Sequence, residues 1–434
     1  MRVKVFQQID GERVPALIRK KNCIPVFYPN VYVSTVVRPQ NLQSATLQVN
    51  LYALMHLYAW ARNHQIDLEE RFLAKAKFLD YQETGLLRAE VKLRHKALVE
   101  LGIEIPDSTK KPRRVQSQKQ KCRLAKKKSQ PQYRSPKSSN TTLSYIIEYL
   151  DWLAGMAIGG GPDTSRSTEA LEKNRSDMNK WLKIGICTAK NRNSGTGEIR
   201  EGLSRKDDER FFKLIDPKSK DNPFSHAHAK YRNYVFMKVC RILALRKSEA
   251  LGLCVDDINF SKGEIQIYRR PDNPDDPRTN EPNAKTSDRE LLLGDELRHL
   301  LKKYIDEFRN EYEGCKNHNF VFVAEGTGEP LSKSAANQIF ETIRCVPNLS
   351  DGLRRVSAHV LRFTWCERFY EDKLDELGES ALLSAMIQQC GWVKNTKMVE
   401  KYANKAITKR SNRALLNYQD ETLGTKGDTN VQQN

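Results

Sequence analysis

The sequence predicts a mainly helical α+β protein with two domains. Its 434 residues are too many for one small core. Apolar residues recur every three or four positions through much of the chain, which is typical of amphipathic helices. Only a few short segments are rich in β-branched residues, and these predict a small sheet rather than a β domain.

Residues 1–40 predict a β-rich N-terminal extension. The segments RVKVFQQID (2–10), RVPALI (13–18) and VYVSTVV (31–37) have the composition of strands. Between the first two segments, Gly11 favours a turn.

Residues 41–185 predict a helical domain. Its clearest helix is 44–65, where Leu47, Leu51, Leu54 and Leu57 repeat at three- and four-residue steps. Further helices are predicted over 67–79, 85–102, 141–158 and 167–185.

A basic loop over 108–140 interrupts this domain. Its stretch 110–137 contains many Lys, Arg and Gln residues and no acidic residue, which predicts a solvated loop. Such a loop could lie along the phosphates of a nucleic acid. The candidate contacts are Arg113, Arg114, Lys126, Lys127 and Lys128.

A second domain is predicted over 200–418. Helices are expected at 202–215 and 231–253, and strands at 264–270 and 290–293 flank an insertion rich in Pro, Asp and Asn. The chain then reads as mainly helical to about 418. The tail, 419–434, has the composition of a disordered segment.

The composition favours a polyanionic partner. The chain has 73 Lys and Arg residues against 54 Asp and Glu residues, a formal charge of +19. A protein that is merely basic would show the same excess. Nine scattered cysteines without a C-x-x-C pair indicate reduced thiols and argue against a zinc ribbon. A polar start and no long apolar run predict a cytoplasmic protein without a membrane segment.

Several polar residues stand out within the second domain. ALRKSEALGL places Arg246 and Glu249 three residues apart, which by itself fits a surface ion pair. AKTSDRELLL places Lys285 just before a strand, where an exposed lysine is ordinary. Lys262 is an alternative to Lys285, although it precedes the first strand of the pair.

HVLR places His359 and Arg362 at the head of an apolar helix, where polar side chains need partners. Trp392 and Tyr402 follow in GW and EKY. HAH at 226–228 could suggest a metal site, but a third ligand in register is missing, so we predict no metal.

In this order, these five motifs resemble the tyrosine recombinase (phage integrase) family over about residues 200–410. The resemblance implies a helical core-binding domain and a catalytic domain that form a C-shaped clamp on double-stranded DNA. It also implies strand cleavage by a tyrosine through a 3′-phosphotyrosyl intermediate, without a cofactor. The resemblance assigns the catalytic roles to Arg246, Lys285, His359, Arg362, Trp392 and Tyr402, and an orienting role to Glu249.

The family pattern is not followed everywhere. The step from Trp392 to Tyr402 is one residue longer than usual in the family, and Ala244 stands where the family often has a glycine.

The resemblance also implies partners and leaves alternatives. A homotetramer would hold two DNA sites, with accessory DNA-bending proteins as further partners, and the long chain favours the integrase of a mobile element. A DNA-binding protein of this fold without catalysis, a type IB topoisomerase and a basic RNA- or nucleoid-binding protein remain alternatives. The first would keep its function without Tyr402, and the second would relax plasmids as a lone protomer.

Overall fold

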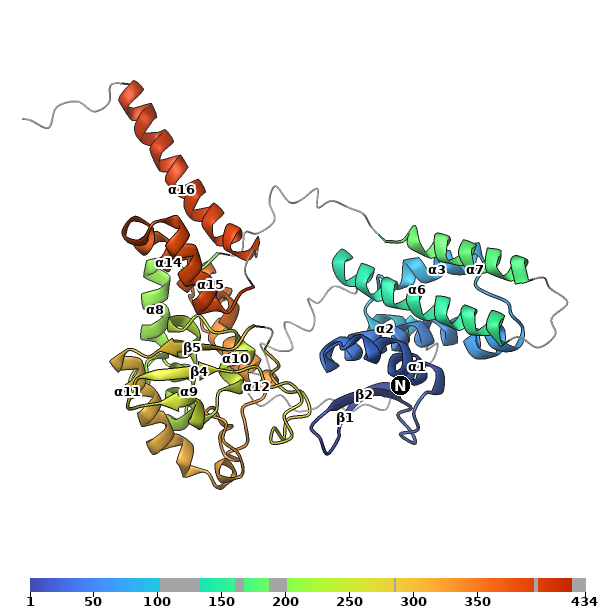
Figure 1. Ribbon diagram of the computed structural model, residues 1–434, viewed down its shortest axis with the longest axis horizontal. Coiled ribbons are helices and arrows are strands. Elements are labelled where there is room, and N and C mark those ends of the chain that lie inside the picture. Colours follow the sequence, from blue (N-terminus) through green and yellow to red (C-terminus); the bar gives the residue numbers. More distant parts are fainter. Residues whose placement is uncertain (102–132, 161–167, 187–200, 285, 394–396, 424–434) are drawn as a thin grey trace, which may run out of the picture. The chain divides into compact units, whose positions relative to one another are not determined.

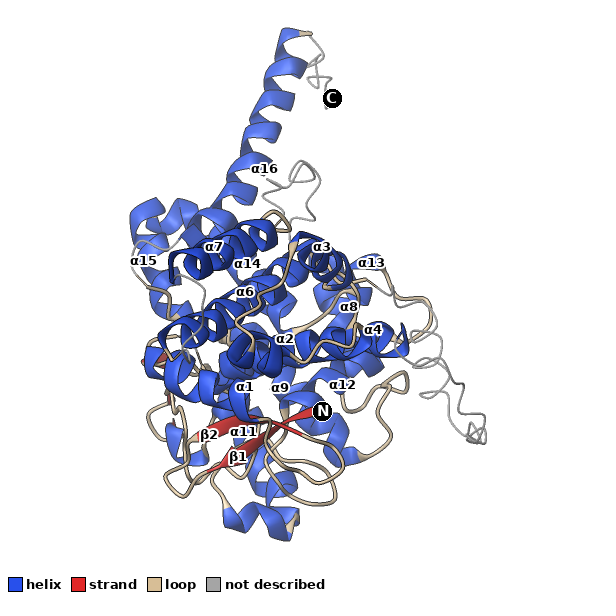
Figure 2. Cartoon of the chain, turned by 90° about the vertical axis from the view of Figure 1, so that its right-hand side faces the viewer, coloured by secondary structure: helices blue, strands red, loops and turns tan. Residues whose placement is uncertain are grey.

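In the computed structural model, the chain divides into two compact units, Met1–Gly195 and Thr196–Asn434. The structure describes residues 1–101, 133–160, 168–186, 201–284, 286–393 and 397–423. Helices make up most of both units (Figure 2). The predicted α+β class, mainly helical with little sheet, is confirmed.

The first unit is a helical bundle with one hairpin on it (Figure 1). In the hairpin, β1 and β2 pair antiparallel, with Val3 opposite Leu17. The elements are β1 (Arg2–Gln7), β2 (Arg13–Ile18), α1 (Phe27–Tyr32), α2 (Ser44–Asn63), α3 (Tyr81–Glu90), α4 (His95–Leu101), α6 (Pro136–Gly159) and α7 (Thr168–Lys183).

Helices α2 and α6 form the core of this unit. Leu51, Leu54, Leu57 and Trp60 of α2 are fully buried, as the three- and four-residue steps predict. They pack with Ile146, Leu150 and Leu153 of α6 in one hydrophobic cluster.

Some local predictions for this unit are wrong. Residues 31–37 are helical, because α1 continues into a π-helical turn over Val33–Val37. The Asn30 side chain fixes this segment, since it donates to the carbonyl of Leu17 at 2.9 Å and accepts from the Leu17 amide. Burial of Tyr32 and Val33 then outweighs the strand propensity of the sequence. The predicted helix 67–79 is reduced to a short stretch containing the π-helical turn Glu70–Ala74, and 85–102 is divided between α3 and α4.

The second unit packs helices around a three-stranded antiparallel sheet of order β3-β4-β5. Ile265 of β4 lies opposite Leu291 of β5, and both side chains are buried. The elements are α8 (Arg205–Ile215), α9 (Ala227–Ile242), α10 (Lys247–Gly252), β3 (Ile258–Asn259), β4 (Glu264–Ile267), β5 (Arg289–Leu292), α11 (Asp295–Lys303), α12 (Lys333–Arg344), α13 (Asp351–Arg354), α14 (Ala358–Leu377), α15 (Glu379–Cys390) and α16 (Lys397–Thr422).

The predicted continuous helix 231–253 is wrong. Helix α9 ends at Ile242, Ala244 takes a left-handed conformation with φ of +52°, and α10 begins at Lys247. This break places Arg246 immediately before α10 rather than on a helical face. The helix α16 ends at Thr422, so residues 419–422 of the predicted disordered tail are helical, and 424–434 lie outside the described residues.

The structure also bears on the expectations about cysteines and membrane segments. Among the described residues, six cysteines are free thiols, but Cys345 is disulfide-bonded, so the expectation of reduced thiols is wrong at that position. Within the described ranges, no helix is long and apolar enough to span a bilayer.

Burial along α2 predicts a contrast between two positions on that helix. Leu57→Ala should lower the free energy of unfolding of the first unit by about 2–5 kcal/mol, because it leaves a cavity in the core. Val49→Ala, at a side chain that is 46% exposed, should cost under about 0.5 kcal/mol. Native-state hydrogen exchange of the α2 amides measures both, and equal protection in the two variants would contradict this core assignment.

Candidate active site

Four of the residues singled out in the second domain come from separate elements that meet at one place. Arg246 precedes α10, Glu249 lies in the first turn of α10, Arg362 is on α14, and Trp392 follows α15. A fourth element, β5, brings Arg289 to the same place.

The Glu249 carboxylate lies at the centre of this group, and its side chain is fully buried. Its Oε2 accepts a hydrogen bond from the Arg246 backbone amide at 2.9 Å and one from Arg289 Nη2 at 3.0 Å. Its Oε1 accepts from Arg246 Nη1 at 3.3 Å and from the Thr286 hydroxyl. Arg362 Nη1 lies 3.7 Å from Oε2. Four residues are thus oriented by one carboxylate.

The charge state of Glu249 follows from these neighbours. Burial opposes ionisation, but Arg289 and Arg362 together with the hydrogen bonds from Thr286 and the Arg246 amide outweigh it and lower the pKa of Glu249. The carboxylate is therefore ionised at neutral pH, and its negative charge is shared among the arginines.

The last carbonyls of helix α15 hold the same arginines from the other side. The Cys390 carbonyl accepts from Arg362 Nη2 at 2.8 Å and from Arg246 Nη1 at 3.4 Å. The Gln389 carbonyl accepts from Arg289 Nε at 2.9 Å. Carbonyls at a helix C-terminus lack intrahelical donors and carry partial negative charge, which suits buried cations.

Gly391 makes this helix end possible. Its φ of +59° lies in the left-handed region, which ends α15 directly after Cys390. A Cβ atom at this position would lie 2.7 Å from Arg289 Nη1. Glycine is therefore required both by the backbone conformation and by the close approach of Arg289.

Ala244 plays the corresponding part at the break before α10. It is fully buried with a positive φ, and its carbonyl accepts from Arg362 Nη1 at 2.6 Å. The turn thus directs a carbonyl at the guanidinium while it sends the chain into α10. The glycine that the family often has at this position would adopt this conformation without strain.

The three arginines differ in exposure. The side chain of Arg246 is 31% exposed, whereas those of Arg289 and Arg362 are 5% and 1% exposed. Three guanidinium charges contact one carboxylate, so three positive charges less one negative leave an excess of two. Such an excess, open to solvent at Arg246, is an anion-binding arrangement.

Trp392 packs against this group. It is 7% exposed, and its ring centroid lies 5.4 Å from Arg362 Cζ, within the range of a cation–π contact. It belongs to a hydrophobic cluster that includes Phe363 of α14 and Met386 of α15. The indole therefore stabilises both the guanidinium and the junction of these helices.

The other predicted site residues are placed less fully. His359 is exposed in the first turn of α14, and its ring meets that of Phe363 edge-on at 4.6 Å. Tyr402 belongs to α16, but its side chain is outside the described part. Lys285 and the five basic residues Arg113, Arg114, Lys126, Lys127 and Lys128 lie outside the described residues. Their roles stay predictions.

The histidines of HAH are not gathered into a metal site. His226 Nδ1 lies 3.5 Å from Glu325, and His228 is buried against the rings of Tyr304 and Tyr312. In the part of the chain that the structure describes, no three His, Cys, Asp or Glu side chains could hold a metal ion together.

Residues 215–409, which include this whole group, match the model of the phage integrase family. This region is a phage integrase domain. No curated protein sequence matches the chain.

Among solved structures, the chain is similar to three recombinases. One is the Tn1549 transposon integrase in complex with transposon right end DNA, at 13% identity over 88% of this chain and 100% of that one, with a TM-score of 0.42. The second is the XerH site-specific recombinase bound to its palindromic difH substrate, at 17% identity over 85% and 95%, with a TM-score of 0.41. The third is the XerA recombinase, at 14% identity over 68% and 89%, with a TM-score of 0.34.

Sequence reasoning missed three residues of the integrase domain's arginine cluster: Thr286, Arg289 and Gly391. A signal for Arg289 exists, because it alternates with Leu291 on β5 and so shares the inward face of the strand. Gly391 stands directly after an apolar helical segment, as a C-terminal glycine does. Nothing in the sequence marks Thr286.

The central carboxylate predicts a large effect of one neutralisation. Glu249→Gln should lower the free energy of unfolding of the integrase domain by about 3–5 kcal/mol, because it leaves buried arginines without their counter-charge. Hydrogen exchange of the α14 amides measures the change. Glu209→Gln, at an exposed residue of α8, should change it by under about 0.5 kcal/mol.

The comparison of wild type with Glu249→Gln also predicts a pH dependence of stability. The folded protein lowers the pKa of Glu249, so the ionised carboxylate stabilises the fold above the unfolded value of about 4.3. This stabilisation is lost as the pH falls through the lower, folded pKa. The difference in stability between wild type and Glu249→Gln should therefore be constant from pH 6 to 8 and shrink in acid, and a difference that grows in acid would contradict the assignment.

The left-handed turn predicts opposite tolerance for two substitutions at Ala244. Ala244→Gly relieves strain of about 1 kcal/mol and loses a buried methyl of similar value, so stability should change little. Ala244→Val should destabilise by at least about 2 kcal/mol, because a β-branched residue resists positive φ. Urea denaturation of both variants tests this prediction. A valine variant as stable as wild type would show that the left-handed conformation at residue 244 is not required for stability.

Proposed function

We propose that the protein is a site-specific DNA recombinase that integrates or excises a mobile element. Its phage integrase domain would cut and rejoin DNA through a 3′-phosphotyrosyl intermediate at Tyr402. The observation that carries the proposal is the buried group of three arginines around one carboxylate, with its excess of positive charge beside solvent-accessible Arg246.

This charge fits the chemistry of phosphodiester cleavage. Attack on the phosphorus places negative charge on the non-bridging oxygens, and preorganised donors stabilise that charge without reorganising during the reaction. Arg246 would donate to these oxygens directly, since it is the accessible guanidinium of the group. Arg362 is buried behind Arg246 and would add its positive charge to the site. Trp392, which packs on the Arg362 guanidinium, would line the phosphate site beside it.

The proposed nucleophile lies on a helix that packs next to the arginine site. Helix α16, which carries Tyr402, contacts α14, which carries Arg362, and also α15, whose end holds the arginines. A phenolate attack would conserve the energy of the phosphodiester in a covalent phosphotyrosine, so that religation needs no nucleotide cofactor.

Two residues would move protons. Lys285 would protonate the departing 5′ oxygen, and support comes from its neighbour Thr286, whose hydroxyl donates to Glu249 at the centre of the site. Lys262 is exposed in the turn before β4, where its backbone N–H donates to Asn259 Oδ1 at 3.0 Å, and among the described residues it has no contact with Glu249. His359, exposed one turn before Arg362 on α14, would hydrogen-bond the phosphate or the attacking phenol.

Double-stranded DNA is the proposed partner. The formal charge of +19 supports phosphate binding, to which Arg113, Arg114 and Lys126–Lys128 would contribute. Four protomers would synapse two sites, assisted by DNA-bending proteins. The apolar side chains Leu415, Leu416 and Tyr418 of α16, each more than half exposed, would pack on a neighbouring protomer.

The decisive experiment is covalent trapping on a nicked suicide duplex taken from the ends of the element that encodes the protein. Wild type should form a protein–DNA adduct through the 3′ phosphate, visible on a denaturing gel. Tyr402→Phe should form none, because phenylalanine lacks the hydroxyl. Tyr418→Phe is the matched control, since Tyr418 lies on the same helix, is 68% exposed and would keep its apolar ring for packing on a neighbouring protomer; its adduct should persist.

The other outcomes are equally informative. An adduct that survives Tyr402→Phe would assign the nucleophile to another residue. Tight DNA binding without any adduct would favour a DNA-binding protein that does not catalyse. Sequence-independent relaxation of a supercoiled plasmid by single protomers would favour topoisomerase activity instead.

A further inference from the structure

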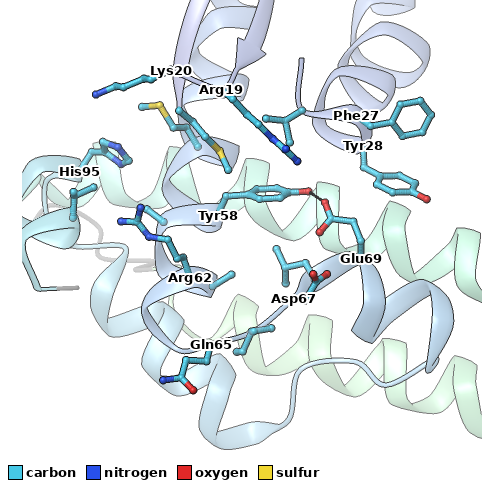
Figure 3. Close-up of a pocket in the computed structure, with 18 residues that line it drawn as sticks. Arg19, Lys20, Phe27, Tyr28, Tyr58, Arg62, Gln65, Asp67, Glu69 and His95 are labelled. Carbon is cyan, nitrogen blue, oxygen red and sulfur yellow. Dashed lines mark hydrogen bonds between the residues drawn. The ribbon is translucent and has the colours of Figure 1, made fainter. Parts of the chain in front are cut away.

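The first unit contains a cavity of about 860 Å³ that the proposed recombination chemistry does not use (Figure 3). The residues directly after β2, helices α1, α2 and α4, and the segment 65–69 line it. Its volume lies in the range of small-molecule sites, which is about 300–1,000 Å³. All of its lining residues belong to this unit, so its shape does not depend on the second unit.

One end of the cavity is cationic. Lys20, Arg62 and His95 come together there (Figure 3), and burial, followed by the charges of Arg134, Lys20 and Arg62 among others, lowers the pKa of His95. Among the described residues, neither Lys20 nor Arg62 has a side-chain hydrogen bond or ion pair, and His95 Nδ1 is buried without a partner. Unpaired cations beside an unpaired ring nitrogen are suited to an anion.

The other end is aromatic. Phe27 and Tyr28 of α1 stand there, with ring centroids 5.0 Å apart and planes at 88° (Figure 3). Phe27 is 68% exposed, which is unusual for a large apolar side chain. Two rings meeting edge to face leave a face free on which a planar group can stack.

Polar groups lie between the two ends. The Tyr58 hydroxyl donates to Glu69 Oε1, and Arg19 points into the cavity above them (Figure 3). Three cations, Arg19, Lys20 and Arg62, face two acids, Asp67 and Glu69, so the cavity keeps a net positive charge. A ligand that fills it needs an anionic end, a polar middle and a flat end.

We propose that this cavity binds a free nucleotide. Its phosphates would lie against Lys20, Arg62 and His95, its sugar against Tyr58 and Glu69, and its base against Phe27 and Tyr28. Inorganic phosphate alone would leave the aromatic end empty, and a nucleoside would leave the cations unpaired. The site lies wholly in the first unit, so the inference does not rest on the proposed recombinase activity.

The test is isothermal titration of the full-length protein at fixed ionic strength with ATP, tripolyphosphate and adenosine. ATP should bind wild type at least about tenfold more tightly than tripolyphosphate, because only ATP also stacks on the aromatic end. Arg62→Ala should weaken ATP and tripolyphosphate alike by about tenfold. Phe27→Ala should weaken ATP by a similar factor and leave tripolyphosphate unchanged.

Two controls make the result decisive. Lys173→Ala removes an exposed lysine of α7 outside the cavity, and should bind ATP as wild type does. Tyr402→Phe should also bind ATP normally, which separates this inference from the recombinase proposal. Equal ATP affinities of Arg62→Ala and Lys173→Ala, or equal binding of ATP and tripolyphosphate to wild type, would overturn the proposal, because either shows that general positive charge attracts the ligand.

Discussion

The ion-pair group around Glu249 is the interaction on which the second unit depends. Isolated guanidinium groups in a protein interior carry a large desolvation cost, and a single carboxylate cannot neutralise three of them. The remaining stabilisation comes from carbonyl oxygens of Ala244, Gln389 and Cys390, which accept hydrogen bonds from the arginines. The carboxylate and the carbonyl dipoles together stabilise the buried arginines but leave a net positive charge. A bound phosphate would neutralise that remaining charge.

Two left-handed backbone turns make those carbonyls available. One lies at Ala244, between α9 and α10, and the other at Gly391, directly after α15. Each turn ends a helix and directs a backbone carbonyl toward the arginines. These carbonyl dipoles stabilise the guanidinium groups without neutralising them, whereas additional carboxylates would cancel the positive charge of the site. The left-handed conformation of Ala244 costs about 1 kcal/mol of strain. Such a cost is consistent with a backbone conformation that is kept because it serves the arginine site, not because the overall fold requires it.

The sequence predicts the regular helices and strands better than the positions at which helices are interrupted. The periodic helix of residues 44–65 and the strand pairs are where the pattern places them, since burial of a regular stripe leaves a strong signal. The break at Ala244 was not predictable from propensity, because alanine is the best helix former. The motifs pointed to Arg246 and Arg362, but Arg289 and its contact with Glu249 depend on strand register and on the end of α15, which are tertiary features.

The arginine cluster around Glu249 and the cationic end of the cavity in the first unit differ in how they would use their charge. Arg289 and Arg362 are held by several fixed acceptors and are almost fully buried, so little conformational entropy remains to be lost when an anion arrives. Lys20 and Arg62 are exposed and unrestrained among the described residues, and must be ordered by their ligand. The first arrangement suits stabilisation of a short-lived charge at a defined position. The second suits reversible binding of a ligand whose own rings and phosphates impose the order, and it is the more strongly screened by salt.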